Sequence, residues 1–370
     1  MRTTEAAILR EPGQPCAWEQ AELQDLAADE ILVRMAGVGV CHTDLLAAAG
    51  TVPLPLPVVL GHEGAGTVEA VGPGVDTLCA GDEVILTFDS CGQCALCQAG
   101  HPAYCELSAA LNYTGTRLDG STTLRQGQHP LYGCWFGQSS FATHAVARVR
   151  NAVKVPARPG ELPLELLGPL GCGLQTGAGT VFNVLRPQPG QSIAVFGLGP
   201  VGLSAVLAAA ATGCGLVIGV EPNPHRAALA RELGADHTID PAATDDIDWA
   251  IADIASPGVD FTIDTVGSPP VVRQALTALR TPGVCATVGL QAMENDVTVD
   301  QGHLLMGRTL TGVIEGDADP HTFIPRLIEL WQQGRFPFER LISQFPYNRI
   351  NDAFEAARCG KVVKPLLVFD

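Results

Sequence analysis

The chain has 370 residues, of which 22 are Lys or Arg and 39 are Asp or Glu, so its formal net charge is −17. This excess of negative charge repels phosphate backbones and acidic lipid headgroups, and we therefore expect neither a nucleic-acid partner nor a membrane partner. A hydrophobic content of 46%, a charged content of 16% and 41 glycines exclude a disordered chain and indicate a compact enzyme of two or three domains.

Two features of the chain bear on its compartment. The first ten residues lack an uninterrupted apolar core, so we expect no signal peptide and a cytoplasmic protein. Residues 193–220 carry no charge, but glycines and Pro200 divide them into pieces that suit a strand, a turn, a helix and a strand. The twelve cysteines, in a chain of this length, indicate metal or redox chemistry and not a disulfide framework.

Short β-rich runs separated by glycine and proline dominate the first 150 residues, for example 30–35, 66–71 and 83–88. This pattern predicts a mostly antiparallel, barrel-like domain. From about residue 174 strand-like runs alternate with helical stretches, which predicts a doubly wound parallel sheet covered by helices on both faces. The strand-like runs of this second part are 192–196, 216–220, 261–265 and 284–288, its helical stretches include 224–233 and 270–280, and residues 365–369 form a predicted closing strand.

Three dispersed residues could form a catalytic metal site. Cys41, His62 and Cys172 offer two thiolates and an imidazole, and such a set with an open fourth position is a known catalytic zinc shell. Asp44 and Glu63 lie beside these residues in the chain and are predicted to orient the ligands. Taken singly, each cysteine has an alternative as a small buried hydrophobe, and spacing alone does not join the three residues.

The strongest local motif is a cluster of four cysteines, Cys91, Cys94, Cys97 and Cys105. Four thiolates at this spacing can close a tetrahedral shell around Zn²⁺ with no open position, which predicts a structural site. An iron–sulfur cluster is the alternative, because a C-x₂-C-x₂-C run also serves those clusters.

A glycine-rich motif, Gly197, Gly199 and Gly202, follows a predicted strand and opens an Ala-rich helix. Glu221 ends the next predicted strand, which completes the fingerprint of a dinucleotide site. A glutamate at this place binds ribose hydroxyls and repels a 2′-phosphate, so the sequence predicts NAD over NADP. Arg226 makes this choice less sharp, because a nearby guanidinium tolerates phosphate; an adenosine-facing or solvent-exposed role is the other interpretation.

Taken together and in this order, these motifs resemble those of the zinc-dependent medium-chain alcohol dehydrogenases over nearly the whole chain. The resemblance implies a GroES-like catalytic domain at 1–173, a Rossmann domain at 174–314 and a C-terminal segment at 315–370 that returns to the catalytic domain. It implies two Zn²⁺ per chain, with Cys41, His62 and Cys172 holding the catalytic ion and the four clustered cysteines holding the structural one. It demotes the iron–sulfur alternative and implies a homodimer or homotetramer.

The resemblance also implies a mechanism, in which zinc activates the alcohol and Thr43 passes its proton towards the cofactor. Family enzymes of the liver type end this relay at a histidine, where the present chain has Leu46; His42 is the available titrating group, for proton relay or for phosphate binding. Lys364 matches a basic position near the pyrophosphate, with an ordinary surface lysine as the alternative. The residues predicted to bind the cofactor are Thr176, Gly197, Gly199, Pro200, Val201, Gly202, Glu221, Arg226, Val288 and Lys364.

The segment around Trp135 and Phe136 resembles the aryl-alcohol (benzyl-alcohol) dehydrogenase branch, which implies oxidation of primary aromatic or allylic alcohols to aldehydes, reversibly and with NAD. Ordinary core aromatics are the alternative for this pair. Thiol-adduct-dependent formaldehyde dehydrogenases are a rival activity, weakened because Ala109 stands where those that bind glutathione adducts have an arginine. A non-catalytic nucleotide-binding relative is the rival of another class. The predicted substrate pocket contains Thr43, Val52, Trp135, Phe136 and Leu290.

Overall fold

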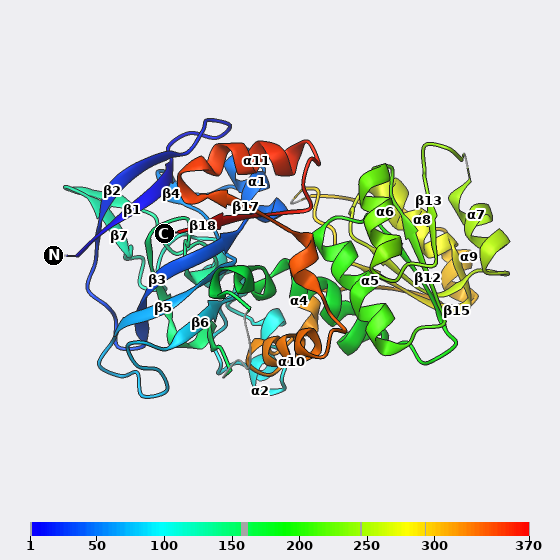
Figure 1. Ribbon diagram of the computed structural model, residues 1–370, viewed down its shortest axis with the longest axis horizontal. Helices are drawn as coiled ribbons and strands as arrows, with labels where there is room; N and C mark the ends of the chain where they lie inside the picture. The colour runs from blue at the N-terminus through cyan, green and yellow to red at the C-terminus, as the bar shows by residue number, and fades with distance from the viewer. Residues whose placement is uncertain (1, 157–161, 245, 293, 370) are drawn as a thin grey trace. The chain divides into compact units, whose positions relative to one another are not determined.

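The computed structural model describes residues 2–156, 162–244, 246–292 and 294–369, which form two compact units (Figure 1). The first unit comprises Met1–Cys172, Asp319–Arg326 and Ile342–Asp370. The second comprises Gly173–Ala318 and Leu327–Leu341. The C-terminal part of the chain thus contributes to both units. Among the described residues, no helix is both long and apolar enough to cross a bilayer.

Two sheets, mostly antiparallel, build the first unit, as the alternation of short β-rich runs predicted. The five-stranded sheet has the order β4-β1-β2-β7-β8, with β1 Arg2–Leu9, β2 Ala17–Leu23, β4 Val58–Val59, β7 Leu124–Gln126 and β8 His129–Leu131. The seven-stranded sheet has the order β10-β6-β5-β3-β18-β17, and β9 also pairs with β3. Its strands are β3 Glu30–Gly39, β5 Gly64–Val71, β6 Glu83–Leu86, β9 His144–Arg148, β10 Ala152–Lys154, β17 Ile342–Pro346 and β18 Lys364–Val368.

Short helices connect these strands, and most of the candidate ligands lie in these helices or directly flank their ends. The α-helices are α1 His42–Ala48, α2 Ala95–Gln98, α3 Ser108–Asn112 and α11 Ile350–Arg358. The 3₁₀-helices are η1 Pro102–Tyr104, η2 Trp135–Gly137, η3 Val149–Asn151, η4 Leu164–Gly171 and η8 Tyr347–Arg349. One apolar core lies between the sheets and includes Ile8, Ile31, Trp135 and Phe141, none of which is more than 1% exposed.

The second unit contains a parallel six-stranded sheet of order β13-β12-β11-β14-β15-β16. Because the chain starts in the middle at β11 and reverses direction between β11 and β14, the sheet is doubly wound, as predicted. Its strands are β11 Ser192–Phe196, β12 Leu216–Val220, β13 His237–Ile239, β14 Val259–Asp264, β15 Leu279–Thr287 and β16 Arg308–Gly312. Its helices are α4 Gly173–Gly179, η5 Thr180–Leu185, α5 Pro200–Thr212, α6 Pro224–Glu232, α7 Ile247–Ile254, α8 Pro269–Thr277, α9 Gln301–Leu305, η6 Glu315–Asp317 and η7 Phe338–Leu341, while α10 Pro320–Gln332 contributes to both units.

The predicted and observed elements differ mainly at one boundary. The helical stretch expected over 270–280 ends at Thr277, and strand β15 begins at Leu279, which pairs with Val259 of β14. Tertiary pairing therefore recruits residues that local propensity assigned to the helix. By contrast, β11 and β12 have the predicted limits, because each is a short run of buried apolar residues bounded by glycine or by a charged residue.

Candidate metal and coenzyme sites

Three separate segments of the first unit bring Cys41, His62 and Cys172 together. Cys41 precedes helix α1, His62 lies between β4 and β5, and Cys172 follows η4. Their ligand atoms all lie within 4.8 Å of one another. His62 is fully buried and Cys172 is 8% exposed, so the fold shields the group from water on most sides.

Asp44 fixes the orientation of His62. Asp44 Oδ1 lies 2.9 Å from His62 Nδ1, and Asp44 Oδ2 accepts a hydrogen bond from the backbone N–H of Cys41 at 3.1 Å. With Nδ1 on the carboxylate, Nε2 is left as the ligand atom, and it is buried without a hydrogen-bond partner among the described residues. A buried imidazole nitrogen beside two thiolates fits Zn²⁺, which binds nitrogen and sulfur.

Cys41 is suited to act as a thiolate. A hydrogen bond from the Cys172 side chain, joined by the charges of His62 and Lys364, holds the pKa of Cys41 well below its usual range although burial opposes this. The Sγ of Cys41 also lies 3.8 Å from the Oγ1 of Thr43, in the first turn of helix α1. His42, the neighbouring titrating residue, has an exposed side chain.

Glu63 and Lys364 form a buried ion pair close to Cys41 and His62. The Lys364 Nζ lies 2.8 Å from each Glu63 carboxylate oxygen and donates to the carbonyl of Val40 at 3.1 Å. Gly39 makes room for the pair, since a Cβ there would collide with the Glu63 carboxylate. Lys364 is only 1% exposed, so it is not a surface lysine. Its predicted contact with the pyrophosphate stays a prediction.

The four clustered cysteines also converge, within one short segment of the first unit. Their sulfur atoms lie within 4.8 Å of one another, and the backbone N–H groups of Cys91 and Cys94 point at the sulfurs of Cys105 and Cys91, at 3.2 and 3.3 Å. Backbone N–H groups of Cys97 and Glu106 lower the pKa of Cys94 to about 6. The group offers four sulfur ligands, which is the donor set of a closed structural zinc site.

In the second unit, the glycine motif forms the turn between β11 and α5. Gly197 has a φ of +85°, and a Cβ on Gly202 would collide with the carbonyl oxygen of Gly197, so both positions require glycine. A Cβ on Gly199 would meet no heavy atom of the described residues within 4 Å. Open space in front of Gly199, at the start of helix α5, leaves backbone N–H groups available to a phosphate.

Glu221 lies at the same edge of the sheet, because Val220 of β12 pairs with Phe196 of β11. Its carboxylate accepts hydrogen bonds from the backbone N–H groups of Leu198 at 2.7 Å and Asn223 at 2.9 Å, which ties it to the glycine turn. Arg226 follows in the first turn of α6, and its Nε is buried without a partner among the described residues. Val288, just beyond β15, donates its N–H to Asp264 at 2.8 Å.

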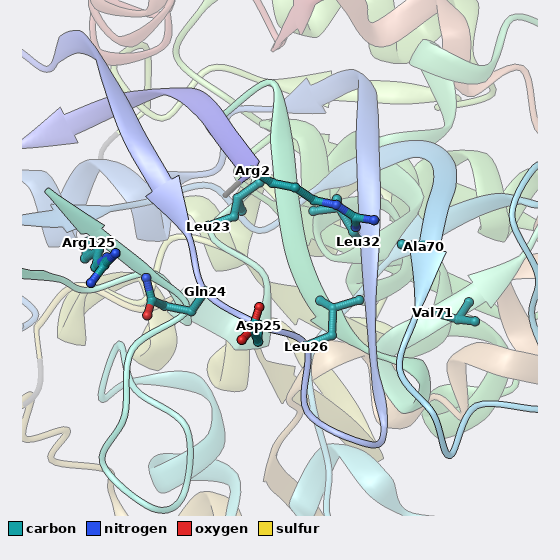
Figure 2. A pocket seen from close by; sticks show the side chains of 9 residues that line it. All are labelled: Arg2, Leu23, Gln24, Asp25, Leu26, Leu32, Ala70, Val71 and Arg125. Atoms are coloured by element: carbon teal, nitrogen blue, oxygen red, sulfur yellow. The ribbon is translucent and has the colours of Figure 1, made fainter. Parts of the chain in front are cut away.

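Of the predicted substrate residues, three lie in the core of the first unit. Val52, Trp135 and Phe136 are 3%, 0% and 5% exposed, and Leu290 belongs to the second unit. Phe136 stacks on the His62 ring with centroids 4.3 Å apart. A cavity of about 600 Å³ opens elsewhere in the first unit (Figure 2), and the described residues that line it include none of the predicted site residues. Arg2, Asp25 and Arg125 supply its charges.

Sequence reasoning missed two residues that hold predicted site residues in place. Gln138 donates from Nε2 to the main-chain carbonyl of His62 at 3.0 Å and accepts from the N–H of Gly64 at 3.2 Å. Glu315, with a φ of +50°, places Oε2 3.5 Å from the hydroxyl of Thr176 in the second unit. Gln138 lies in the segment around Trp135 and Phe136 that carries the aryl-alcohol resemblance, but the sequence does not indicate its contact with His62. Glu315 belongs to none of the recognised motifs.

The fold and the ligand sets define a metal-dependent enzyme with a nucleotide-binding unit, and comparisons with known proteins are consistent with this. The family described as "Alcohol dehydrogenase GroES-like domain" matches residues 27–157, and the family described as "Zinc-binding dehydrogenase" matches residues 200–333. A geraniol dehydrogenase of Castellaniella defragrans is 50% identical over 99% of this chain and 98% of its own length.

Solved structures of alcohol dehydrogenases have the same fold as this chain. The crystal structure of benzyl alcohol dehydrogenase from Acinetobacter calcoaceticus is 40% identical with a TM-score of 0.95, and the two chains cover each other completely. An alcohol dehydrogenase zinc-binding domain protein from Burkholderia ambifaria is 47% identical with a TM-score of 0.96, covering 100% of this chain and 99% of its own. The chain therefore belongs to the zinc-dependent alcohol dehydrogenase family. It is an oxidoreductase that uses zinc and a nicotinamide cofactor, and the family and fold expected from the sequence are confirmed.

Proposed function

We propose that this enzyme oxidises primary aromatic or allylic alcohols to aldehydes, reversibly, with hydride transfer to NAD. The convergence of Cys41, His62 and Cys172 within 4.8 Å, with His62 Nε2 buried and unpartnered among the described residues, is the observation that carries the zinc assignment. The geraniol and benzyl alcohol dehydrogenases among the relatives support an allylic or aromatic substrate. Zinc, when bound, supplies Lewis-acid chemistry that favours loss of the alcohol proton.

The chain's own residues divide the remaining tasks. Cys41, His62 and Cys172 hold the catalytic zinc, while Cys91, Cys94, Cys97 and Cys105 hold the structural one. Thr43, next to the Cys41 sulfur, accepts the alcohol proton as its own hydroxyl proton moves on towards His42. His42 is exposed at the start of helix α1 and passes the proton to solvent, because Leu46 cannot. If His42 relays the proton, His42→Gln changes the pH profile of hydride transfer, and an unchanged profile removes it from the relay.

The cofactor assignment rests on the edge of the parallel sheet. Gly199 and the start of helix α5 receive the pyrophosphate, and Glu221 binds the adenosine ribose next to the glycine turn. A 2′-phosphate there would face the buried carboxylate, so NAD is the preferred cofactor. The guanidinium of Arg226 lies in the first turn of helix α6 and can bind a 2′-phosphate, so we expect the enzyme to retain some activity with NADP.

We further propose a homodimer or homotetramer formed through the second unit, in the cytoplasm. Strand β16 ends the order of the parallel sheet, and Leu304, Leu305 and Met306 just before it are 41%, 77% and 62% exposed. A strand edge that has no further strand partner among the described residues, beside an apolar patch, favours pairing with a second copy. The thiolate ligands need a reducing compartment, which supports the cytoplasm.

The decisive experiment compares initial rates on benzyl, cinnamyl and geranyl alcohols with rates on ethanol, each with NAD and with NADP. The proposal predicts a much larger kcat/KM for the aromatic and allylic alcohols, and for NAD. Equal values for ethanol and benzyl alcohol overturn the substrate class. Metal analysis of the same preparation is expected to find two zinc ions per chain, and a chain without zinc overturns the mechanism.

A further inference from the structure

Trp135 is hydrogen-bonded to Asp44, the carboxylate that contacts the candidate zinc ligand His62. The hypothesis that Trp135 lines a substrate pocket does not include this contact. Its indole N–H donates to Asp44 Oδ1 at 2.9 Å, on the oxygen that also lies 2.9 Å from His62 Nδ1. Asp44 thereby accepts four hydrogen bonds, from Trp135, His62 and the backbone N–H groups of Gly61 and Cys41. Trp135, Asp44 and His62 are each 0% exposed, so water does not compete with these bonds.

The segment that carries Trp135 is held rigidly against His62. Phe136 has a φ of +49°, a conformation that costs energy for a bulky side chain, and it stacks on the imidazole with an interplanar angle of 18°. The Asn151 amide fixes the carbonyl of Phe136 at 3.2 Å, and the Ser139 hydroxyl accepts from the backbone N–H of Trp135 at 2.9 Å. These contacts keep the indole aimed at Asp44.

A carboxylate that accepts a proton from a ligating histidine sets the orientation and the basicity of that ligand. Each further donor on the carboxylate stabilises its charged form and limits its rotation. The Trp135 indole is the only side-chain donor besides His62 that reaches Asp44 among the described residues. Removing it frees one lone pair of a buried carboxylate, which has no water to replace the lost bond.

We propose that Trp135 is a positioning residue for the catalytic zinc, acting through Asp44 on His62 and not as a wall of the alcohol site. This inference rests on the proposed zinc assignment to Cys41, His62 and Cys172. Loss of an outer partner of a metal ligand typically lowers metal affinity about 10–100-fold. Among the described residues, Trp135 has no direct hydrogen bond to the four cysteines, so the four-cysteine site serves as a reference within the same molecule.

The test is zinc release from Trp135→Phe during an EDTA challenge of the full-length, zinc-loaded enzyme, followed with a colorimetric zinc indicator. We expect one of the two zinc ions to leave at least about 10-fold faster than in the unmodified enzyme, and the other to leave at an unchanged rate. Trp249→Phe is the matched control, because Trp249 is 69% exposed in the second unit. Unchanged release in Trp135→Phe overturns the inference.

Two further measurements separate positioning from a wall of the substrate site or a packing role. If Trp135 acts through Asp44, zinc release in the double variant Trp135→Phe/Asp44→Asn is no faster than in Asp44→Asn alone; multiplying effects overturn the inference. A raised KM for benzyl alcohol with unchanged zinc release instead supports the wall. If Trp135→Phe folds poorly, β-(3-benzothienyl)alanine can replace the tryptophan at position 135, because it keeps the ring shape and lacks the N–H. We expect the same faster release of one zinc ion from this variant.

Failure of this inference is distinguishable from failure of the proposed function. An unmodified enzyme that binds only one zinc, at the four cysteines, contradicts the proposed function itself. An unmodified enzyme with two zinc ions, combined with Trp135→Phe that releases both at normal rates, contradicts only the role of Trp135.

Discussion

The two cysteine-containing clusters of the first unit are built in opposite ways. One short segment supplies all four cysteines of the first cluster, Cys91, Cys94, Cys97 and Cys105. Their apolar surroundings are small: the buried residues Cys97, Cys105 and Leu111 pack together, with Cys91 and Cys94 partly buried against them. Cys41, His62 and Cys172 come from three segments and lie against Asp44, the Glu63–Lys364 pair and two aromatic rings. We therefore expect the loop of the first cluster to depend more on its metal, and the ligands of the second cluster to be held mainly by the fold.

Because of this difference, we expect one zinc ion to contribute mainly to the stability of the fold and the other mainly to catalysis. A closed four-thiolate shell leaves no position for a substrate, so its zinc contributes to stability. A three-ligand shell leaves one position open, and its supporting contacts are independent of the ion, so its zinc contributes mainly to catalysis. The predictions below test this division, from the largest expected effect to the smallest.

The largest effect is expected for Cys172→Ala, which removes one ligand of the three-residue cluster. Without its Lewis acid the enzyme should lose at least about 4 kcal/mol of transition-state stabilisation, or about 10³-fold in kcat/KM. Metal analysis should show one zinc ion per chain in place of two, with a nearly unchanged melting temperature. Cys359→Ala, at an exposed cysteine, is the control and should keep both zinc ions and full activity.

A smaller effect is expected when the ion pair beneath the catalytic cluster is broken. Lys364→Met removes the ammonium group that faces the buried Glu63 carboxylate, which should cost about 3 kcal/mol of unfolding free energy. Adding Glu63→Gln removes the buried negative charge and should recover most of that loss. Urea unfolding of the single and double variants measures both values. Equal stability of the two variants would show that the pair does not hold the site together.

Next in size is the response of the four-cysteine lobe. Cys94→Ala should release the structural zinc and cost about 2 kcal/mol, which lowers the melting temperature of a chain of this size by about 2–3 °C. The kcat/KM of the folded fraction should change less than threefold, because the catalytic ligands lie in other segments. Calorimetry with parallel kinetics checks this. A 10³-fold fall in kcat/KM would contradict the division between the two clusters.

The same contrast explains how much of the site the sequence could predict. The four cysteines and the glycine turn are local motifs whose spacing carries the chemistry, so both could be recognised without a fold. Asp44 and Glu63 were placed near the metal because they lie beside the ligands in the chain. Their partners Trp135 and Lys364 lie 91 and 301 residues away, and only the pairing of distant strands brings them close.

Trp135 illustrates why contacts between residues far apart in the sequence are hard to predict. The sequence predicts Trp135 as a wall of the substrate pocket from a family resemblance and from ring size, with core packing as the alternative, and that role stays a prediction. The direction of an indole N–H is not visible, and it decides whether the ring faces a substrate or a carboxylate. Glu315 is a similar case, because nothing near it in the chain indicates a contact with Thr176.

The smallest effect is expected for Phe136→Leu, which removes the stack on His62 and keeps the backbone's left-handed conformation equally unfavourable for the new residue. An aromatic stack is worth about 1 kcal/mol beyond its buried area, which corresponds to roughly fivefold faster release of the catalytic zinc. Phe338→Leu is the matched control, since Phe338 is also buried (0% exposed, against 5% for Phe136) but belongs to the second unit. Both variants should lose similar stability to unfolding, and only Phe136→Leu should accelerate zinc release in an EDTA challenge. If both variants release zinc at the rate of the unmodified enzyme, the ring is ordinary packing, and the support of His62 reduces to the hydrogen bonds of Asp44 and Gln138.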